Sequence, residues 1–325
     1  MKLKRMKRRS DKEIDESFRK VDELFNKIKE QHKEELGYAE LKPIDDKFPF
    51  AQNGICAMIA PVGSGKSYNY LKIMAKQENM FNEPFFELIV ICSTSAKFDK
   101  TVITFKEAIK KSKIVPVKDS DLLEYLNEYM NRIFIYNTIM RFVNDGLKWN
   151  KMDEEMKDLI IKHTGIHRFN SEKSITKAIQ WITNTLKEFG WKTYPHRCLL
   201  VLDDYASHPL LRSKETELSR LLKKLRHFNI NVIICVQTVK SIPKDLKRGL
   251  SDLIIFPGIS QEDFLDLMKE VNTNFIDNKT LWESYRKILN QHSTMTLHLN
   301  AKRVIVSERA NALSPERAIA KNMKK

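Results

Sequence analysis

The fold of this chain is decided at residues 60–67, which are Ala60-Pro61-Val62-Gly63-Ser64-Gly65-Lys66-Ser67. The stretch matches the pattern G-x-x-x-x-G-K-[ST] at every defined position except the first, where Ala60 replaces glycine. The apolar run at 55–59 predicts a buried parallel strand, and residues 68–77 predict a helix because they contain neither Gly nor Pro. A strand, a glycine loop and a helix in this order indicate a phosphate-binding loop.

The loop chemistry assigns a role to each of its polar residues. Gly63 and Gly65 let backbone N–H groups turn towards a phosphate, and the helix N-terminus adds partial positive charge. We expect Lys66 to reach the β- and γ-phosphates and Ser67 to place its hydroxyl on Mg²⁺. The expected ATP-binding residues are Ala60, Pro61, Val62, Gly63, Ser64, Gly65, Lys66, Ser67 and Tyr68.

A Mg-nucleotide site also needs a carboxylate at the end of a second strand. The apolar run at 198–202 predicts this strand, and Asp203 and Asp204 follow it directly. We expect Asp203 to hold Mg²⁺ through its water shell and Asp204 to polarise the attacking water. Glutamate has the second role in many ATPases of this kind, so the shorter Asp204 must lie closer to the water or act through another one.

A third strand is predicted at 231–236, and it ends in the polar pair Gln237-Thr238. An amide at that strand end can hydrogen-bond both the γ-phosphate and the attacking water. Gln237 is therefore a candidate sensor of which nucleotide is bound.

The order of these segments resembles the genome-packaging ATPases of large DNA viruses within the FtsK/HerA superfamily. These include the poxvirus-type packaging ATPases and those of virophages and Maverick/Polinton-like elements. The resemblance lies in the phosphate loop, the Asp203-Asp204 strand, the strand ending in Gln237, and the segments Leu225-Arg226-His227-Phe228-Asn229-Ile230, Ile242-Pro243 and Lys247-Arg248. It implies ATP hydrolysis with Mg²⁺ that drives double-stranded DNA into a preformed capsid. It also implies a homo-oligomeric ring, such as a hexamer, and capsid or portal-vertex partners.

The composition agrees with a polyanionic partner. The chain has 325 residues, with 57 Lys and Arg against 42 Asp and Glu, which gives a net charge of +15. Neutralising phosphates supplies most non-specific affinity for DNA. The basic segment at 2–9 is followed by no apolar run, which argues against a secretory signal and favours a nucleic-acid or nuclear-import tail. No apolar run is long enough to span a membrane.

The remaining segments complete the predicted architecture. An amphipathic helix is expected at 11–35, further strands at 88–92, 132–136 and 253–256, and a hairpin at 294–299 and 303–307. Residues 138–195 indicate a helical insertion. The four cysteines, Cys56, Cys92, Cys198 and Cys235, lie in apolar strands without metal spacing and predict small buried residues of a reducing compartment.

We therefore expect an α/β three-layer P-loop ATPase of the RecA/FtsK-HerA type with a mostly parallel central sheet. The expected division is a tail and helix at 1–42, an ATPase domain at 43–310 and a basic tail at 311–325. The leading function is a DNA-packaging motor acting in the host cytoplasm or nucleus at virion assembly sites, or carried in the virion. The alternatives are a helicase or translocase of the same superfamily, a P-loop nucleotide kinase, and a non-hydrolysing nucleotide switch.

One catalytic group is expected from a neighbouring subunit. The motifs supply Lys66 but no second cation for the γ-phosphate, and an arginine supplied in trans is a common solution. Arg248 is the first candidate, because it follows the Gln237 strand in Lys247-Arg248-Gly249, and Arg226 is the second.

Overall fold

The computed structural model describes residues 53–81, 84, 86–93, 103, 106–107, 109–145, 149–169, 171–189, 197–204, 217–271, 273, 275–288 and 293–307. The helix expected at 11–35 and both terminal tails lie outside these residues. The chain divides into two compact units, and downstream of residue 53, where the described residues begin, the boundaries between them fall at residues 127–128 and 195–196.

The larger unit is built on one eight-stranded sheet of order β3-β2-β4-β5-β1-β6-β7-β8. The first six strands in this order are parallel, and β7 and β8 add two antiparallel strands at one edge. The strands are β1 (Ile55–Ile59), β2 (Leu88–Cys92), β3 (Lys113–Val117), β4 (Cys198–Leu202), β5 (Ile230–Val236), β6 (Asp252–Ile255), β7 (Thr294–His298) and β8 (Arg303–Ser307). This arrangement confirms the expected α/β fold with a mostly parallel sheet.

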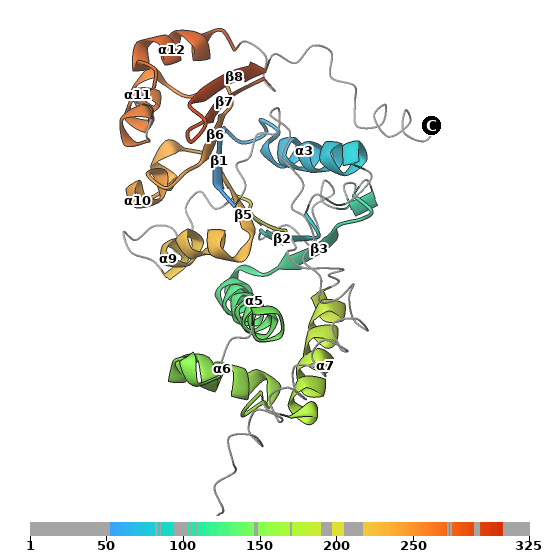
Figure 1. Cartoon of the computed structure of the whole chain (residues 1–325). Coiled ribbons are helices and arrows are strands. Elements are labelled where there is room, and N and C mark those ends of the chain that lie inside the picture. The colour runs from blue at the N-terminus through green and yellow to red at the C-terminus, as the bar shows by residue number, and fades with distance from the viewer. Residues whose placement is uncertain are drawn as a thin grey trace, which may run out of the picture. The chain divides into compact units, whose positions relative to one another are not determined.

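Helices cover both faces of this sheet (Figure 1). One face carries α3 (Lys66–Phe81), and the other carries α9 (Glu217–Lys224), α10 (Lys244–Lys247) and α11 (Gln261–Glu270). Helix α12 (Asn278–Arg286) follows α11. Short 3-10 turns η3 (Leu225–Phe228) and η4 (Val239–Ser241) flank β5. The central strands β1, β2, β4 and β5 are buried at every position, as strands covered on both faces must be.

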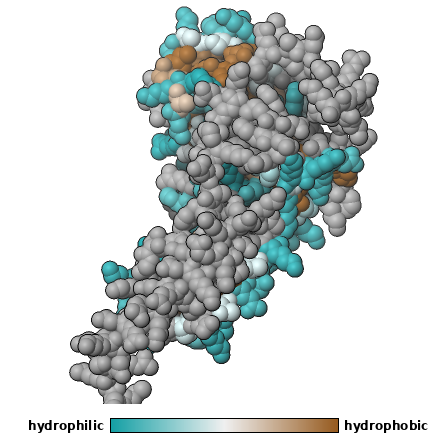
Figure 2. All heavy atoms as spheres, turned by 45° about the vertical axis from the view of Figure 1, so that its right-hand side comes forward, coloured by the Kyte–Doolittle hydropathy of each residue, from teal (hydrophilic) through white to brown (hydrophobic). Residues whose placement is uncertain are grey.

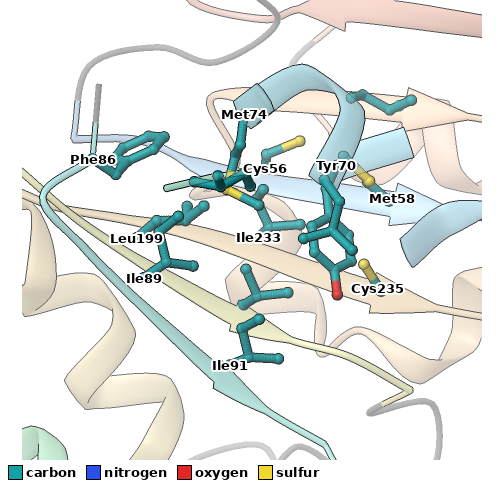
Figure 3. Close-up of a cluster of buried hydrophobic side chains, with 14 of the residues drawn as sticks. Cys56, Met58, Tyr70, Met74, Phe86, Ile89, Ile91, Leu199, Ile233 and Cys235 are labelled. Atoms are coloured by element: carbon teal, nitrogen blue, oxygen red, sulfur yellow. The ribbon is translucent and has the colours of Figure 1, made fainter. Parts of the chain in front are cut away.

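The core between α3 and the sheet lies directly beneath the phosphate loop. Tyr70, Leu71 and Met74 are buried side chains of α3, at the spacing of one helix face. They pack on side chains from β1, β2, β4 and β5 (Figure 3). All four cysteines are buried and free, and Cys56 and Cys235 belong to this cluster, which confirms the prediction of small core residues.

The smaller unit contains most of α5 (Leu122–Asp145), together with α6 (Glu154–Thr164) and α7 (Glu172–Phe189). Helix α6 begins at Asp153, whose side chain accepts a hydrogen bond from Met156 N, and it ends at Gly165 in the left-handed conformation. Arg132 ties two of the helices together, because it pairs with Glu128 on α5 and with Glu188 on α7.

The strand expected at 132–136 is wrong, because these residues lie inside α5. Four successive apolar residues resemble a strand in a short window, but the wider sequence has helical period. One row of its buried positions follows at steps of four and three: Leu122, Leu126, Tyr129, Ile133, Tyr136 and Met140. Strand β3 was not predicted, because Pro116 interrupts its apolar pattern. A proline is tolerated there because β3 is an edge strand.

The other predicted strands and the helix after the phosphate loop are confirmed with small shifts of their ends. Strand β6 begins one residue before the expected start, and the helix after the phosphate loop extends to Phe81. The predicted hairpin is present as β7 and β8. The described residues contain no helix that is long and apolar enough to cross a membrane. On the face drawn in Figure 2, the described side chains are mostly hydrophilic, with a compact hydrophobic patch at the upper end.

Candidate functional site

The phosphate loop connects the carboxyl end of β1 to the first turn of α3. Gly63 and Gly65 both have positive φ, at 77° and 85°, where residues with a side chain are strained. Nothing lies within 4 Å of the position that a Gly63 Cβ would take, so this glycine is required for its backbone angle and not for space. The Ser64 hydroxyl donates to Pro61 O at 2.7 Å and closes the loop internally.

Ala60 fits the loop although the pattern has glycine at this position. It is fully buried in the cluster beneath the loop, and its φ is not among the positive values of the described residues. Its N–H donates to Val236 O at 3.1 Å, as a continuation of the β1–β5 ladder. The departure from the pattern is therefore accommodated by an extension of strand geometry, which needs no glycine.

Lys66 lies at the start of α3 and is only 9% exposed. Its ammonium group donates to Ala60 O at 2.8 Å and to Pro61 O at 3.0 Å. The Lys66 ammonium group is thus bound by two backbone carbonyls of its own loop. A bound phosphate would offer charged oxygen acceptors, which form stronger hydrogen bonds with an ammonium than carbonyls do.

Ser67 and Asp203 meet where the loop faces β4. The Ser67 hydroxyl donates to Asp203 Oδ2 at 2.7 Å, and Asp203 is 8% exposed. Its backbone N–H donates to Cys92 O at 3.0 Å, which fixes the residue to the end of β2. One hydroxyl and one carboxylate fit the way proteins bind Mg²⁺, in which substrate phosphates and waters complete the octahedron. Within the described residues, no three acidic, histidine or cysteine side chains form a metal cluster of their own.

Asp204 and Gln237 form the outer half of the site. The Gln237 amide donates to Asp204 Oδ1 at 2.6 Å, across the carboxyl ends of the adjacent strands β4 and β5. Asp204 is exposed and has φ of 58°, a left-handed conformation that Asp tolerates better than most residues. The sharp turn directs the two neighbouring carboxylates differently: Asp203 bonds to the loop serine and Asp204 bonds to the amide.

Two side chains around Asp203 were missed from sequence. The Tyr70 hydroxyl lies 3.5 Å from Asp203 Oδ2, and the Cys235 thiol also hydrogen-bonds this carboxylate. Burial raises the pKa of Cys235 well above its ordinary value, and the charge of Asp203 raises it further, so the thiol stays protonated. The spacing offered a signal, because Tyr70 lies one helical turn after Ser67 and Cys235 lies two residues before Gln237. Figure 3 shows Tyr70 and Cys235 side by side beneath the loop.

Arg248 is not brought to this site within its own subunit. It is exposed at the C-terminal end of α10, three residues before Ser251, whose N–H donates to Ile55 O at the amino end of β1. The phosphate loop leaves the other end of that strand, roughly 16 Å away for five residues. Arg226 lies in η3, just before the amino end of β5. The backbone of each candidate arginine therefore lies near the amino ends of the central strands, whereas the phosphate loop lies at their carboxyl ends.

Comparisons with known proteins extend this description. Residues 149–311, half of the chain, match the family described as Poxvirus A32 protein. The matched region begins downstream of the phosphate loop and includes Asp203, Asp204 and Gln237. No curated protein matches the chain.

Several solved structures are similar in fold. The genome packaging NTPase B204 from Sulfolobus turreted icosahedral virus 2 is 13% identical, with a TM-score of 0.44 over 80% of this chain and 100% of that one. EssC (ATPases 2 and 3) from Geobacillus thermodenitrificans is 9% identical, with a TM-score of 0.47 over 84% of this chain and 43% of that one. At these identities and TM-scores, the similarities assign no function.

Proposed function

Because the chain belongs to the poxvirus A32 protein family, we propose that it is an ATP-hydrolysing motor that moves double-stranded DNA and packages a viral genome into a preformed capsid. The chain is an ATPase of the FtsK/HerA superfamily. The proposal rests on the position of the site residues, which follow the carboxyl ends of three strands that lie together in the sheet. There Lys66 and Ser67 follow β1, Asp203 and Asp204 follow β4, and Gln237 follows β5.

The loop and its cation bind the triphosphate in this mechanism. Lys66 exchanges the carbonyls of Ala60 and Pro61 for oxygens of the β- and γ-phosphates, and the N–H groups of the glycine loop donate to the same phosphates. Ser67 and Asp203 would hold Mg²⁺, which neutralises charge on the phosphate oxygens. Tyr70 and Cys235 keep the Asp203 carboxylate turned towards Ser67.

Asp204 and Gln237 act on the attacking water. The water oxygen forms a bond to the γ-phosphorus while the bond from this phosphorus to the bridging oxygen of ADP breaks. Asp204 accepts a hydrogen bond from the water and takes its proton as the bond forms. The Gln237 amide already hydrogen-bonds Asp204. If the same amide also binds the γ-phosphate, the position of the Asp204 carboxylate depends on whether the γ-phosphate is present.

The charge of the chain supports DNA as the partner. Its net charge of +15 favours binding to the phosphate backbone without base readout, as a motor that moves along any sequence requires. We also propose a homo-oligomeric ring in which Arg248 reaches a neighbour's γ-phosphate, together with capsid or portal-vertex partners at virion assembly sites. Arg248 lies near the amino ends of the strands, and the phosphate loop of its own subunit lies at their carboxyl ends. This separation favours action of Arg248 in trans.

Phosphate release measured with and without DNA tests this function. A packaging motor predicts faster release of inorganic phosphate when duplex DNA is added, with no separation of its strands. A helicase of the same superfamily would separate the strands, and a kinase would transfer the phosphate to an acceptor and ignore DNA. Phosphate release that duplex DNA does not change would contradict the proposal.

A further inference from the structure

The turn that follows β6 is closed by one side chain from α12. The Tyr285 hydroxyl donates to Phe256 O at 2.8 Å and accepts from Ile259 N at 2.9 Å. Burial raises the pKa of Tyr285, and the N–H groups of Ile259 and Gly258 lower it. The turn from Phe256 to Ile259 therefore has a fixed shape that is set by a residue 26 positions further along the chain.

The ring of Tyr285 is itself held in place. It stacks on Phe264 of α11 with 4.9 Å between the ring centroids, and Trp282 lies 5.5 Å from it. Phe264 is fully buried and Tyr285 is nearly so. Aromatic packing of this kind stabilises a rotamer beyond its buried area, so the hydroxyl is presented to the turn before any ligand arrives.

The turn lies against the first half of the phosphate loop. Phe256 N donates to Ile59 O at 3.0 Å, and Ile59 is the residue directly before the loop. Gly258 has φ of 104°, and a Cβ at this residue would lie 3.1 Å from Pro61 Cγ. The glycine is required both for the backbone angle and for the close approach to Pro61.

The strand order gives this turn a place along a bound nucleotide. The groups that face the γ-phosphate, Asp204 and Gln237, follow β4 and β5 on one side of β1. The turn follows β6, which is the neighbour of β1 on the other side, about 4.8 Å away. We therefore expect a nucleotide whose β-phosphate lies in the loop after β1 to direct its ribose and base towards β6.

Four of the described residues of the loop and the turn have apolar side chains. Pro61 and Val62 from the loop, and Pro257 and Ile259 from the turn, define a surface that we name the apolar shelf. Val62 is 78% exposed, and Pro257 and Ile259 are half-buried. Pro61 and Pro257 have no backbone N–H group. In the turn, the Tyr285 hydroxyl already hydrogen-bonds Phe256 O and Ile259 N. The side chains of the four shelf residues offer contact area and carry no hydrogen-bonding group that could read the edge of a base.

We propose that the apolar shelf receives the purine base of the bound nucleotide, and that Tyr285 is the residue that positions it. This inference rests on the proposed ATPase function and adds a base subsite to the phosphate site. A flat apolar contact can stabilise any large aromatic base. An apolar pocket also discriminates only weakly against an analogue that carries added polar groups. The apolar shelf therefore predicts affinities for ATP and GTP within about tenfold of each other.

Binding of Mg-ATP and of inorganic tripolyphosphate, which has no base, tests the inference on the full-length protein. Ile259→Ala removes apolar contact from the apolar shelf, so we expect Mg-ATP affinity to fall about three- to tenfold. Tripolyphosphate affinity should stay within about twofold, since the loop that binds it is unchanged. Val306→Ala, at an exposed apolar position on β8, is the control and should change neither affinity.

Tyr285→Phe provides a second variant, because it removes the hydroxyl and keeps the ring and every shelf side chain. It should also weaken Mg-ATP more than tripolyphosphate. Equal loss of both affinities in the two variants would show that the turn only supports the loop, and unchanged Mg-ATP affinity would show that the base lies elsewhere. A smaller assembly with unchanged Mg-ATP affinity would assign the apolar shelf to a second copy of the chain. If the phosphate site were wrong, the unaltered protein would bind neither ligand.

Discussion

Gln237 donates its side-chain amide to Asp204 at 2.6 Å, and this hydrogen bond joins the ends of two adjacent parallel strands. The pair lies beside a second one, Ser67 and Asp203, that points into the phosphate loop. Two neighbouring acids on one strand thus have different partners, and this difference predicts different phenotypes.

Replacing the two acids one at a time separates their functions. Asp204→Asn should leave Mg-ATP binding near its normal value and slow hydrolysis about 10²- to 10⁴-fold, because the group that takes the proton is lost. Asp203→Asn should weaken Mg-ATP binding at least about tenfold, because it removes a carboxylate from the metal site. Single-turnover hydrolysis and equilibrium binding measure the two effects. Equal loss of affinity in both variants, with hydrolysis retained by Asp204→Asn, would contradict these assignments.

Lys66→Ala removes the cation that caps the loop. We expect a folded protein whose ATP turnover falls at least about 10²- to 10³-fold, since charge on the transferring phosphate loses its stabiliser. Circular dichroism checks the fold and phosphate release checks the rate. Lys240→Ala, which alters an exposed lysine on η4, is the matched control and should keep basal turnover. Normal turnover by pure Lys66→Ala protein would refute the phosphate site.

The basic N-terminal tail is predicted to bind DNA. Deleting residues 1–10 removes six cations: Lys2, Lys4, Arg5, Lys7, Arg8 and Arg9. Affinity for duplex DNA should fall alike for all sequences. The slope of log K against log salt should flatten by about 0.9 for each DNA phosphate that the shortened protein no longer neutralises. ATPase activity without DNA should not change. An unchanged salt slope would mark the tail as a solubilising or import segment.

Complementation tests whether Arg248 acts in trans. Lys66→Ala protein lacks a working loop but keeps Arg248, and Arg248→Ala protein keeps its loop. Each should be nearly inactive alone, because an arginine in trans is worth about 10³-fold or more in rate. Their mixture should recover part of the ATPase activity and lose it on dilution. Full activity of Arg248→Ala alone, or no recovery in rings shown to be mixed, would move the assignment to Arg226.

The positions of the loop and of the strand-end residues could be predicted from the sequence because the physics that sets them is local. A glycine loop after a strand has few alternative conformations, and polar residues that end parallel strands meet at the same sheet edge. Lys66, Asp203 and Gln237 could therefore be placed together from their position after apolar runs. Their roles in catalysis remain predictions for the variants above.

Interactions between distant segments could not be predicted in this way. Tyr285 bonds to Phe256 and Ile259 through the packing of two helices, and no periodic pattern links these residues. The segment at 132–136 was assigned to a strand because a five-residue window cannot distinguish a buried strand from one stretch of a buried helix. Strand β3 depends on its pairing with β2, which a single sequence containing Pro116 does not reveal.

Displacement of a third strand from duplex DNA tests the central claim most directly, because a protein that moves along the duplex removes a triplex-forming strand in its path. The full-length protein with Mg-ATP should release the third strand at a rate that depends on ATP, while the two duplex strands stay paired. Lys66→Ala protein, and the unaltered protein with a non-hydrolysable analogue, should not release it. A third strand that stays bound while ATP is hydrolysed, or that Lys66→Ala protein releases equally well, would contradict an ATP-driven DNA motor.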